Sequence, residues 1–332
     1  TYSKKKLMTI LITGTAGFIG FSCAQALLKK NKIVIGVDNI NSYYDQKIKR
    51  DRLKILKKFS NFHFLHNDLN DIALYKSLNK YKNKIKYILH FAGQAGVRYS
   101  IIRPDVYIKD NIMSFIKLLE YFKKVKQVKL LLFASSSSVY GESTKNISYL
   151  PQSKPISVYA ASKLSMELIS NSYISIYKMK IIGLRFFSVY GPWGRPDMAY
   201  YKITDKIYNN KFVELYNKGN HKRSFTYIDD VVNSIVKLIK KKPPKEKNSK
   251  ARFQILNIGN DKSVSLKKLL NIIEKNLEKK SKKKLLPLQL GDIKDTKANI
   301  NLLKKITGYK FKVNLHEGMF RFIVWYLNYK KK

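Results

Sequence analysis

Short apolar runs alternate with longer segments of helical spacing through the first 190 residues of the chain. The runs are continuously hydrophobic, which is typical of parallel strands that helices cover on both faces. The predicted strands are 8–13, 33–37, 62–66, 87–92, 130–135 and 181–187. The predicted helices between them are 18–30, 45–58, 71–80, 104–122 and 158–176. Because crossover connections are right-handed, this order predicts an α/β fold with a doubly wound parallel sheet and a ligand at the carboxyl ends of its strands.

The pattern changes after Gly191, where a loop rich in proline and glycine is followed by shorter elements. Further helices are predicted to begin at Asp229 and to span 266–278 and 316–329. The lysine-rich segments 240–250 and 279–284 are typical of solvated surface loops. We therefore expect a smaller carboxyl-terminal lobe beside the sheet.

Three glycines, Gly14, Gly17 and Gly20, follow the first predicted strand and open the first predicted helix. Glycine at these places permits a tight turn, lets the backbone approach a pyrophosphate, and lets the helix pack close to the strand. Asp38 ends the second strand, where a carboxylate accepts bonds from ribose hydroxyls and repels a 2′-phosphate. This favours NAD over NADP in a Rossmann-like site. Asp68 follows the third strand and either contacts adenine or caps a turn.

A tyrosine and a lysine, Tyr159 and Lys163, are separated by about one helical turn. This spacing predicts that the ammonium lies beside the phenol, lowers its pKa and lets Tyr159 act as a base. The helix follows a strand that ends in four serines, 135–138. Their hydroxyls are expected to point into the cofactor crevice, where one can share a proton with Tyr159.

Together these segments resemble the extended short-chain dehydrogenases that modify nucleotide sugars, and within them the UDP-glucuronate 4-epimerases. The resemblance rests on TGTAGFIG, GVDNINSYYD, HFAGQAGVRYSI, ASSSSVYG, YAASK, LRFFSVYGPWGRPDMA and RSFTYIDD. It implies Ser136, Tyr159 and Lys163 as the catalytic residues. Around NAD it implies Gly14, Gly17, Phe18, Ile19, Gly20, Asp38, Asn39, Asp68, Leu69, Ala92, Gly93, Tyr159 and Lys163. Near the UDP-sugar it implies Arg98, Ser137, Ser138, Ser188, Arg195 and Arg223. One position departs from the family, since Ser224 stands where an acid usually follows the arginine.

The resemblance implies an NAD-dependent epimerisation of UDP-glucuronate to UDP-galacturonate through a transient 4-keto sugar, with Tyr159 as the base. A 4-keto uronate loses carbon dioxide readily, so such an enzyme must hold the carboxylate. The hydroxyls of Ser137, Ser138 and Ser188 suit this task. Arg195 could contact the uronate or the diphosphate, or instead brace the turn at Trp193.

The same residues are also compatible with other activities. The first alternative is a UDP-glucuronate decarboxylase, which uses the same first step. The next alternatives are 4-epimerases of UDP-glucose or UDP-N-acetylglucosamine. A 4,6-dehydratase is disfavoured because Ser137 and Ser138 stand where that branch places acids. A protein of another class, a catalytically inactive regulator that senses NAD, would not need Ser136, Tyr159 and Lys163.

The domain organisation expected is an NAD-binding domain of residues 1–190, joined by parts of 225–258, and a discontinuous lobe within 191–332 for the sugar nucleotide. Relatives commonly form dimers through two helices per subunit. These correspond here to 104–122 and 158–176, so the resemblance implies a homodimer.

Composition narrows the choice of partners. The formal net charge is +44, but only nine of the 66 basic residues are arginine, the residue on which nucleic-acid readers rely. The lysines accompany many Ile, Asn and Tyr, so codon bias explains the charge and no specific nucleic-acid partner is expected. Cys23 is the only cysteine, which excludes an internal disulfide and suits the cytoplasm. No run reaches the ~18 apolar residues of a membrane helix, and we expect neither a membrane segment nor a metal site.

Overall fold

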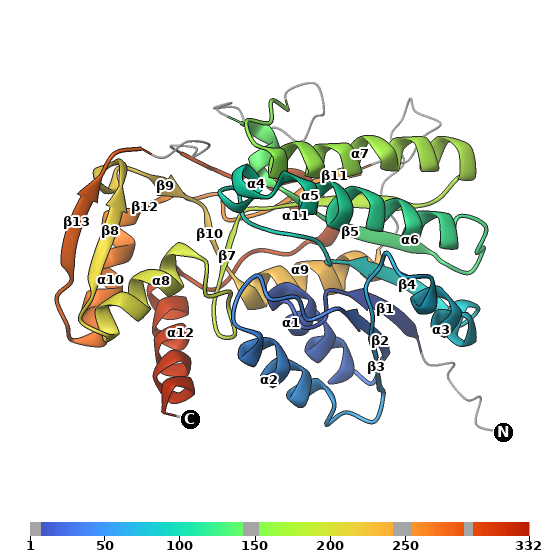
Figure 1. Ribbon diagram of the computed structural model, residues 1–332, viewed down its shortest axis with the longest axis horizontal. Coiled ribbons are helices and arrows are strands. Elements are labelled where there is room, and N and C mark those ends of the chain that lie inside the picture. The colour runs from blue at the N-terminus through green and yellow to red at the C-terminus, as the bar shows by residue number, and fades with distance from the viewer. Residues whose placement is uncertain (1–7, 142–152, 242–253, 289–294, 332) are drawn as a thin grey trace.

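A seven-stranded parallel sheet forms the centre of the protein in a computed structural model that describes residues 8–141, 153–241, 254–288 and 295–331 (Figure 1). The strand order is β11-β6-β5-β4-β1-β2-β3, so the direction of winding reverses between β1 and β4. The strands are β1 (Thr9–Thr13), β2 (Ile33–Asp38), β3 (Phe62–His66), β4 (Ile85–His90), β5 (Leu130–Ser136), β6 (Ile181–Phe186) and β11 (Gln254–Ile258). The doubly wound parallel sheet that the sequence predicted is confirmed.

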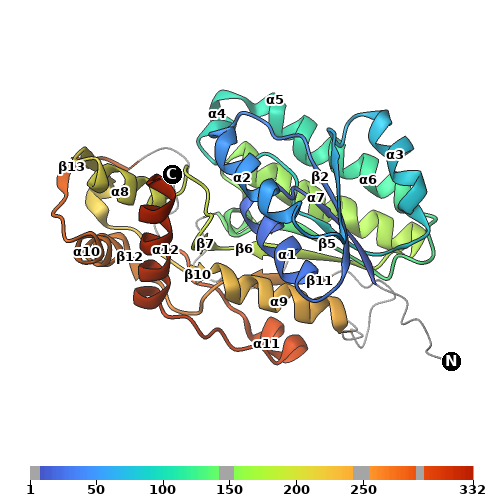
Figure 2. The ribbon, with the colours of Figure 1, turned by 90° about the horizontal axis from the view of Figure 1, so that it is seen from below.

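Helices cover both faces of the sheet (Figure 2). On one face lie α1 (Phe18–Leu28), α9 (Ile228–Lys240) and α11 (Asn301–Thr307); on the other lie α3 (Ile72–Lys82), α6 (Ser114–Phe122) and α7 (Val158–Tyr177). Helix α2 (Gln46–Leu56) packs beside α1, and the short helices α4 (Tyr99–Ile102) and α5 (Pro104–Tyr107) precede α6. The predicted helix 104–122 is not uniform, because a π-helical segment, η1 (Ile108–Met113), joins α5 to α6.

The carboxyl-terminal part of the chain builds a smaller lobe at the carboxyl ends of the strands. Its elements are β7 (Ser188–Tyr190), α8 (Ala199–Tyr208), β8 (Phe212–Tyr216), η4 (Asn217–Gly219), β9 (Lys222–Arg223), β10 (Phe225–Tyr227), β12 (Val264–Ser265), α10 (Leu266–Leu277), β13 (Lys282–Leu286) and α12 (Leu315–Lys330). The predicted helices 266–278 and 316–329 match α10 and α12. The expectation of a loop at 279–284 is wrong in part, because Lys282, Lys283 and Lys284 begin β13, which pairs with β8 and keeps these side chains exposed. Most of the predicted loop 240–250 lies outside the described residues.

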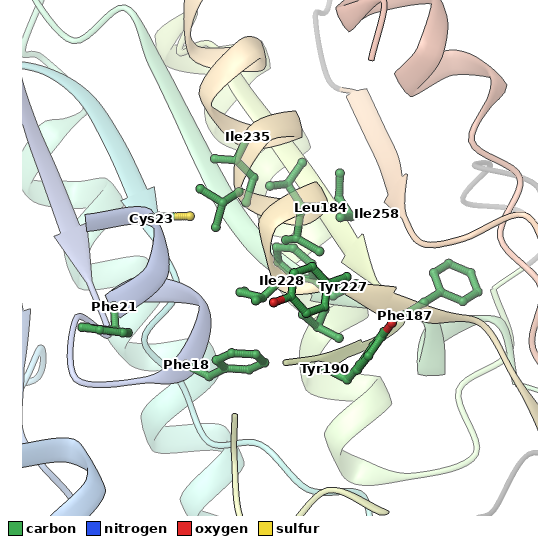
Figure 3. Close-up of a cluster of buried hydrophobic side chains, with 14 of the residues drawn as sticks. Phe18, Phe21, Cys23, Leu184, Phe187, Tyr190, Tyr227, Ile228, Ile235 and Ile258 are labelled. Atoms are coloured by element: carbon green, nitrogen blue, oxygen red, sulfur yellow. The ribbon is translucent and has the colours of Figure 1, made fainter. Parts of the chain in front are cut away.

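A continuous apolar core joins the lobe to the sheet (Figure 3). Phe18 and Phe21 of α1 pack with Ile228 of α9 and with Tyr190 of β7 in this cluster. Cys23 lies in the same core, where burial raises the pKa of its thiol far above the ordinary value, so it stays protonated and unreactive. The lobe is therefore held firmly against the strand ends that carry the predicted site.

No helix within the described residues has both the length and the apolar character needed to cross a membrane. In the same part of the chain, His, Cys, Asp and Glu side chains form no group that could hold a metal ion.

Candidate active site

A cavity of about 660 Å³ lies between the carboxyl ends of the strands and the smaller lobe. Residues that directly follow β1, β2, β4, β5 and β6 line one side, and residues of α8, β8 and β9 line the other. Every residue that the sequence suggested for catalysis, NAD or the sugar nucleotide lines this cavity. The tertiary structure thus brings the whole predicted set together.

The loop between β1 and α1 has the shape that a pyrophosphate needs. Gly14 has a φ of +78° and lies so close to the end of β4 that a Cβ atom there would stand 2.6 Å from the Ala92 nitrogen. No side chain caps the start of α1 at Gly17. The first N–H groups of the helix, and the positive end of its dipole, can therefore meet an anion. These features fit a dinucleotide.

The two acids assigned to the cofactor are held by hydrogen bonds. Asp38 accepts from the Ala16 nitrogen at 2.9 Å and from the Ile40 nitrogen at 2.8 Å, so it braces the glycine loop from the end of β2. Burial raises the pKa of this carboxyl, while the two N–H groups oppose the shift. Asp68 accepts from the Asn70 nitrogen at 2.8 Å, as a turn-forming acid does. Bonds from Asn70 and Asn39 outweigh partial burial and hold its pKa below the usual value.

The serine and tyrosine of the predicted catalytic group meet in the structure. Ser136 ends β5 and accepts from the Ser138 nitrogen at 3.1 Å, at the start of the 3₁₀ turn η2 (Ser137–Tyr140). Tyr159 lies in the first turn of α7, which Ser157 caps. Burial raises the pKa of the Tyr159 phenol, while a hydrogen bond with Ser136 and the charge of Arg195 lower it.

Lys163 follows Tyr159 on α7, and both residues line the cavity. Its ammonium lies 3.8 Å from the Met166 sulfur and beside the backbone of Gly93. The side chain thus reaches from α7 to the loop after β4. The effect of this lysine on the pKa of the Tyr159 phenol stays a prediction from the spacing. Burial, and to a smaller extent Arg195, lowers the pKa of Lys163 to about 8.

Two buried polar clusters that the sequence did not reveal hold α7 in place. Asn111 of η1 accepts from the Gln94 nitrogen at 2.7 Å and donates to Ser162 of α7 at 2.8 Å. Arg185 of β6 and Glu167 of α7 form an ion pair at 2.6 Å. Both of these side chains are fully buried.

The Glu167 carboxylate also accepts from the Ser135 hydroxyl. The guanidinium of Arg185 stacks 4.5 Å from the centre of the Tyr140 ring. These contacts tie β5, β6 and α7 together beside the serine turn.

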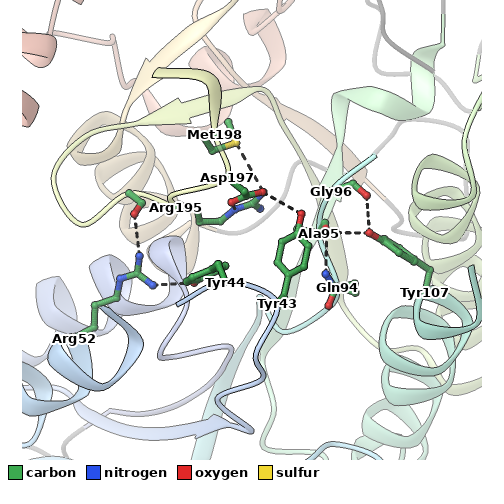
Figure 4. A network of polar contacts seen from close by, with 11 residues as sticks. Tyr43, Tyr44, Arg52, Gln94, Ala95, Gly96, Tyr107, Arg195, Asp197 and Met198 are labelled. Carbon is green, nitrogen blue, oxygen red and sulfur yellow. Dashed lines mark hydrogen bonds and ion pairs between the residues drawn. The ribbon is translucent and has the colours of Figure 1, made fainter. Parts of the chain in front are cut away.

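The loop 191–198 approaches the cavity and is fixed from two sides (Figure 4). Arg195 makes a bidentate ion pair with Asp197, with Nε at 3.0 Å from Oδ1 and Nη2 at 2.6 Å from Oδ2. The brace of the Trp193 turn is a different residue, Arg52 of α2, which donates to the Trp193 carbonyl at 2.6 Å and to the Ala16 carbonyl at 2.7 Å. Arg52 was not predicted, because nothing near it in the sequence marks it.

The remaining predicted residues for the sugar nucleotide lie farther along the cavity. Arg98 stacks 4.6 Å from the centre of the Tyr216 ring, and Arg223 donates to the Lys222 carbonyl at 3.1 Å. Ser224 is fully buried and donates to the Asn260 carbonyl at 2.6 Å. At this position the hydroxyl therefore anchors the backbone beside Arg223.

The parallel sheet, the glycine loop and the paired Ser136 and Tyr159 define a dinucleotide-dependent enzyme. The sequence profile of the NAD dependent epimerase/dehydratase family matches residues 10–259, and the chain belongs to this NAD-dependent family. Curated relatives include UDP-glucuronate 4-epimerase 4 of Arabidopsis thaliana, 39% identical over 97% of this chain and 76% of that protein. A probable UDP-glucuronate 4-epimerase of Rhizobium meliloti is 39% identical over 98% of both chains. Among solved structures, the UDP-glucuronic acid 4-epimerase from Bacillus cereus in complex with UDP-glucuronic acid and NAD has a TM-score of 0.88 and 31% identity, over 97% of this chain and 100% of that one.

Proposed function

We propose that the protein converts UDP-glucuronate to UDP-galacturonate by inverting the fourth carbon of the sugar. The observation that carries this proposal is a cavity that presents the hydrogen-bonded Ser136 and Tyr159 together with a partly buried arginine, Arg195. The first two suit proton transfer at a sugar hydroxyl, and a guanidinium suits a carboxylate. The names of the curated relatives and of the Bacillus cereus structure support the same assignment.

The residues of the chain supply the proton chemistry. When held by the glycine loop and Asp38, NAD would supply the hydride chemistry, and its positive charge would favour the phenolate of Tyr159. Tyr159 takes the proton of the 4-hydroxyl as the 4-keto sugar forms, and Ser136 shares that proton. Lys163 lies beside Gly93 and would help to hold the cofactor. After the keto sugar has rotated to present the opposite face of its fourth carbon, Tyr159 returns the proton to the 4-oxygen.

Neutral donors and one guanidinium would keep the carboxylate on the sugar. Ser137, Ser138, Ser188 and Arg195 all line the cavity. If these groups hold the carboxylate in the plane of the sugar, the carbon–carbon bond overlaps poorly with the 4-keto group and carbon dioxide is not lost. Cationic Arg98 and Arg223 line the same cavity and suit a diphosphate.

The product assay is the direct test. Purified protein with NAD is incubated with UDP-glucuronate and the nucleotide sugars are separated. We expect UDP-galacturonate with the carboxylate retained. We expect Tyr159→Phe to lower the rate by about 10²–10⁴. The control Tyr121→Phe, whose hydroxyl bonds Asn79 on the outer surface, is expected to leave the rate unchanged.

Other products would point to other functions. Carbon dioxide with a UDP-pentose would identify a decarboxylase, and much faster turnover of UDP-glucose or UDP-N-acetylglucosamine would mean that the serines were misinterpreted. NAD binding without turnover of any of these sugars would favour the inactive regulator.

The expected division of labour between the two parts of the chain forms part of this proposal. We assign NAD to residues 1–190 with the later segments that join the sheet, and the sugar nucleotide to the lobe within 191–332. The activity suits the cytoplasm, where nucleotide sugars are made for polysaccharide synthesis.

We also propose a homodimer through the helical stretch 104–122 and α7. Both expose large apolar side chains, among them Ile108 at 50%, Leu168 at 53% and Ile176 at 68%. Exposed apolar faces on two adjacent helices suit a self-complementary contact with a second copy of the chain. Light scattering is expected to give twice the chain mass, and Leu168→Glu to give the mass of one chain. A monomeric wild-type protein at micromolar concentration would refute the dimer.

A further inference from the structure

Two adjacent tyrosines, Tyr43 and Tyr44, connect the loop after β2 to the loop 191–198 (Figure 4). The Tyr43 hydroxyl donates to Oδ2 of Asp197 at 3.2 Å. The Tyr44 hydroxyl accepts from Arg52 at 2.9 Å. Each tyrosine therefore contacts a side chain that anchors the same distant loop.

The contact of Tyr43 bears on how Arg195 is presented to a ligand. Asp197 engages Nε and Nη2 of Arg195, so the ion pair sets the orientation of the guanidinium plane and Nη1 is the nitrogen open to a further acceptor. Arg195 lines the same cavity as Tyr159 and Lys163, and its charge acts to lower the pKa values of both. A carboxylate on the bound sugar would come within its reach.

Asp197 in turn depends on Tyr43, and the position of Tyr43 is itself well determined. The Gly96 backbone has a φ of +105°, and a Cβ atom there would collide with the Tyr43 hydroxyl. The segment around Gly96 is pinned by Tyr107, which donates to the Ala95 carbonyl at 2.9 Å. The ring of Tyr43 packs 5.1 Å from that of Tyr99. The glycine thus makes room for one hydroxyl, and the packed rings aim it at Asp197.

We infer that Tyr43 is a positioning residue that sets the preference for an acidic sugar. Its hydroxyl fixes Asp197, Asp197 fixes the Arg195 guanidinium, and the guanidinium receives the carboxylate of the sugar. This inference rests on the proposed function, because it assigns the carboxylate to Arg195. It differs from a packing role, since Phe at position 43 would keep every ring contact and lose only the bond to Asp197.

The test compares the binding of two ligands that differ in one carboxylate. NAD-loaded protein carrying Tyr159→Phe, which blocks turnover, is titrated by calorimetry with UDP-glucuronate and with UDP-glucose. The same titrations are made after adding Tyr43→Phe. The ratio of the two dissociation constants is expected to fall by about tenfold, because a hydrogen bond to a charged group is lost. The dissociation constant of UDP-glucuronate should rise, and that of UDP-glucose should stay the same.

A matched control variant separates the role of Tyr43 from a general effect of losing a tyrosine hydroxyl. Tyr121→Phe in the same background removes a tyrosine hydroxyl outside the cavity and should leave the ratio unchanged. An unchanged ratio with Tyr43→Phe, or equal weakening of both ligands, would show that Tyr43 only shapes the cavity, and would overturn the inference. No preference for UDP-glucuronate in the parent protein would overturn the proposed function, and the inference with it. Thermal unfolding of each variant confirms that the fold is kept.

Discussion

Removal of the Glu167 carboxylate should destabilise the protein strongly. Glu167 and Arg185 are both fully buried, and the carboxylate accepts two bonds from the guanidinium and one from Ser135. Glu167→Ala would leave a buried cation without its counter-charge and a buried hydroxyl without its acceptor. Breaking a buried pair in this way costs about 3–5 kcal/mol.

This loss of unfolding free energy corresponds to a fall in the melting temperature, Tm. A chain of 332 residues has an unfolding entropy of roughly 0.7 kcal/mol/K, so Tm should fall by about 4–7 °C. Scanning calorimetry measures this shift. The exposed pair of Arg103 and Asp105 provides the control, and Asp105→Ala should leave Tm unchanged.

A double variant separates the lost charge pair from the lost packing. With Glu167→Leu and Arg185→Met together, no charge stays buried without a partner, so at least half of the lost stability should return. A fall in Tm of less than 1 °C for Glu167→Ala, or no recovery in the double variant, would refute the reasoning.

Three further results are expected. NAD should bind at least about tenfold more tightly than NADP, because Asp38 ends β2 where a 2′-phosphate would lie; equal affinities in a fluorescence titration would remove Asp38 from the ribose site. The value of kcat/KM should decline above about pH 8, because burial lowers the pKa of Lys163 to about 8 and deprotonation removes its positive charge. A profile that stays level to pH 10 would show that activity does not need the Lys163 ammonium. Arg52→Met should lower the free energy of unfolding by about 3 kcal/mol and weaken NAD binding, since the carbonyls of Ala16, Trp193 and Gly194 each lose a buried donor. Chemical denaturation and an NAD titration measure the two effects, and an unchanged variant would show that water replaces the guanidinium.

The sequence alone was sufficient for the elements and for the residues that follow the strands. Strands of continuous apolar residues that alternate with helices are typical of a sheet that helices cover on both faces, so the parallel sheet followed from the hydrophobic pattern. Gly14, Ser136 and Tyr159 could be placed because the carboxyl ends of parallel strands share one edge of the sheet. These features depend on short stretches of chain, within which spacing and side-chain type decide the outcome.

The tertiary structure decided which charged and polar groups meet. Tyr43 contacts Asp197 across 154 positions, and Arg52 reaches Trp193 across 141, distances over which no local pattern carries information. Lys163 shows the same limit within a single helix turn. Its spacing places it one turn after Tyr159, but its contact with the backbone of Gly93 comes from a loop that is distant in the sequence. A side chain with several rotatable bonds follows the partners that folding brings near it, and those partners are set by the packing of the whole chain.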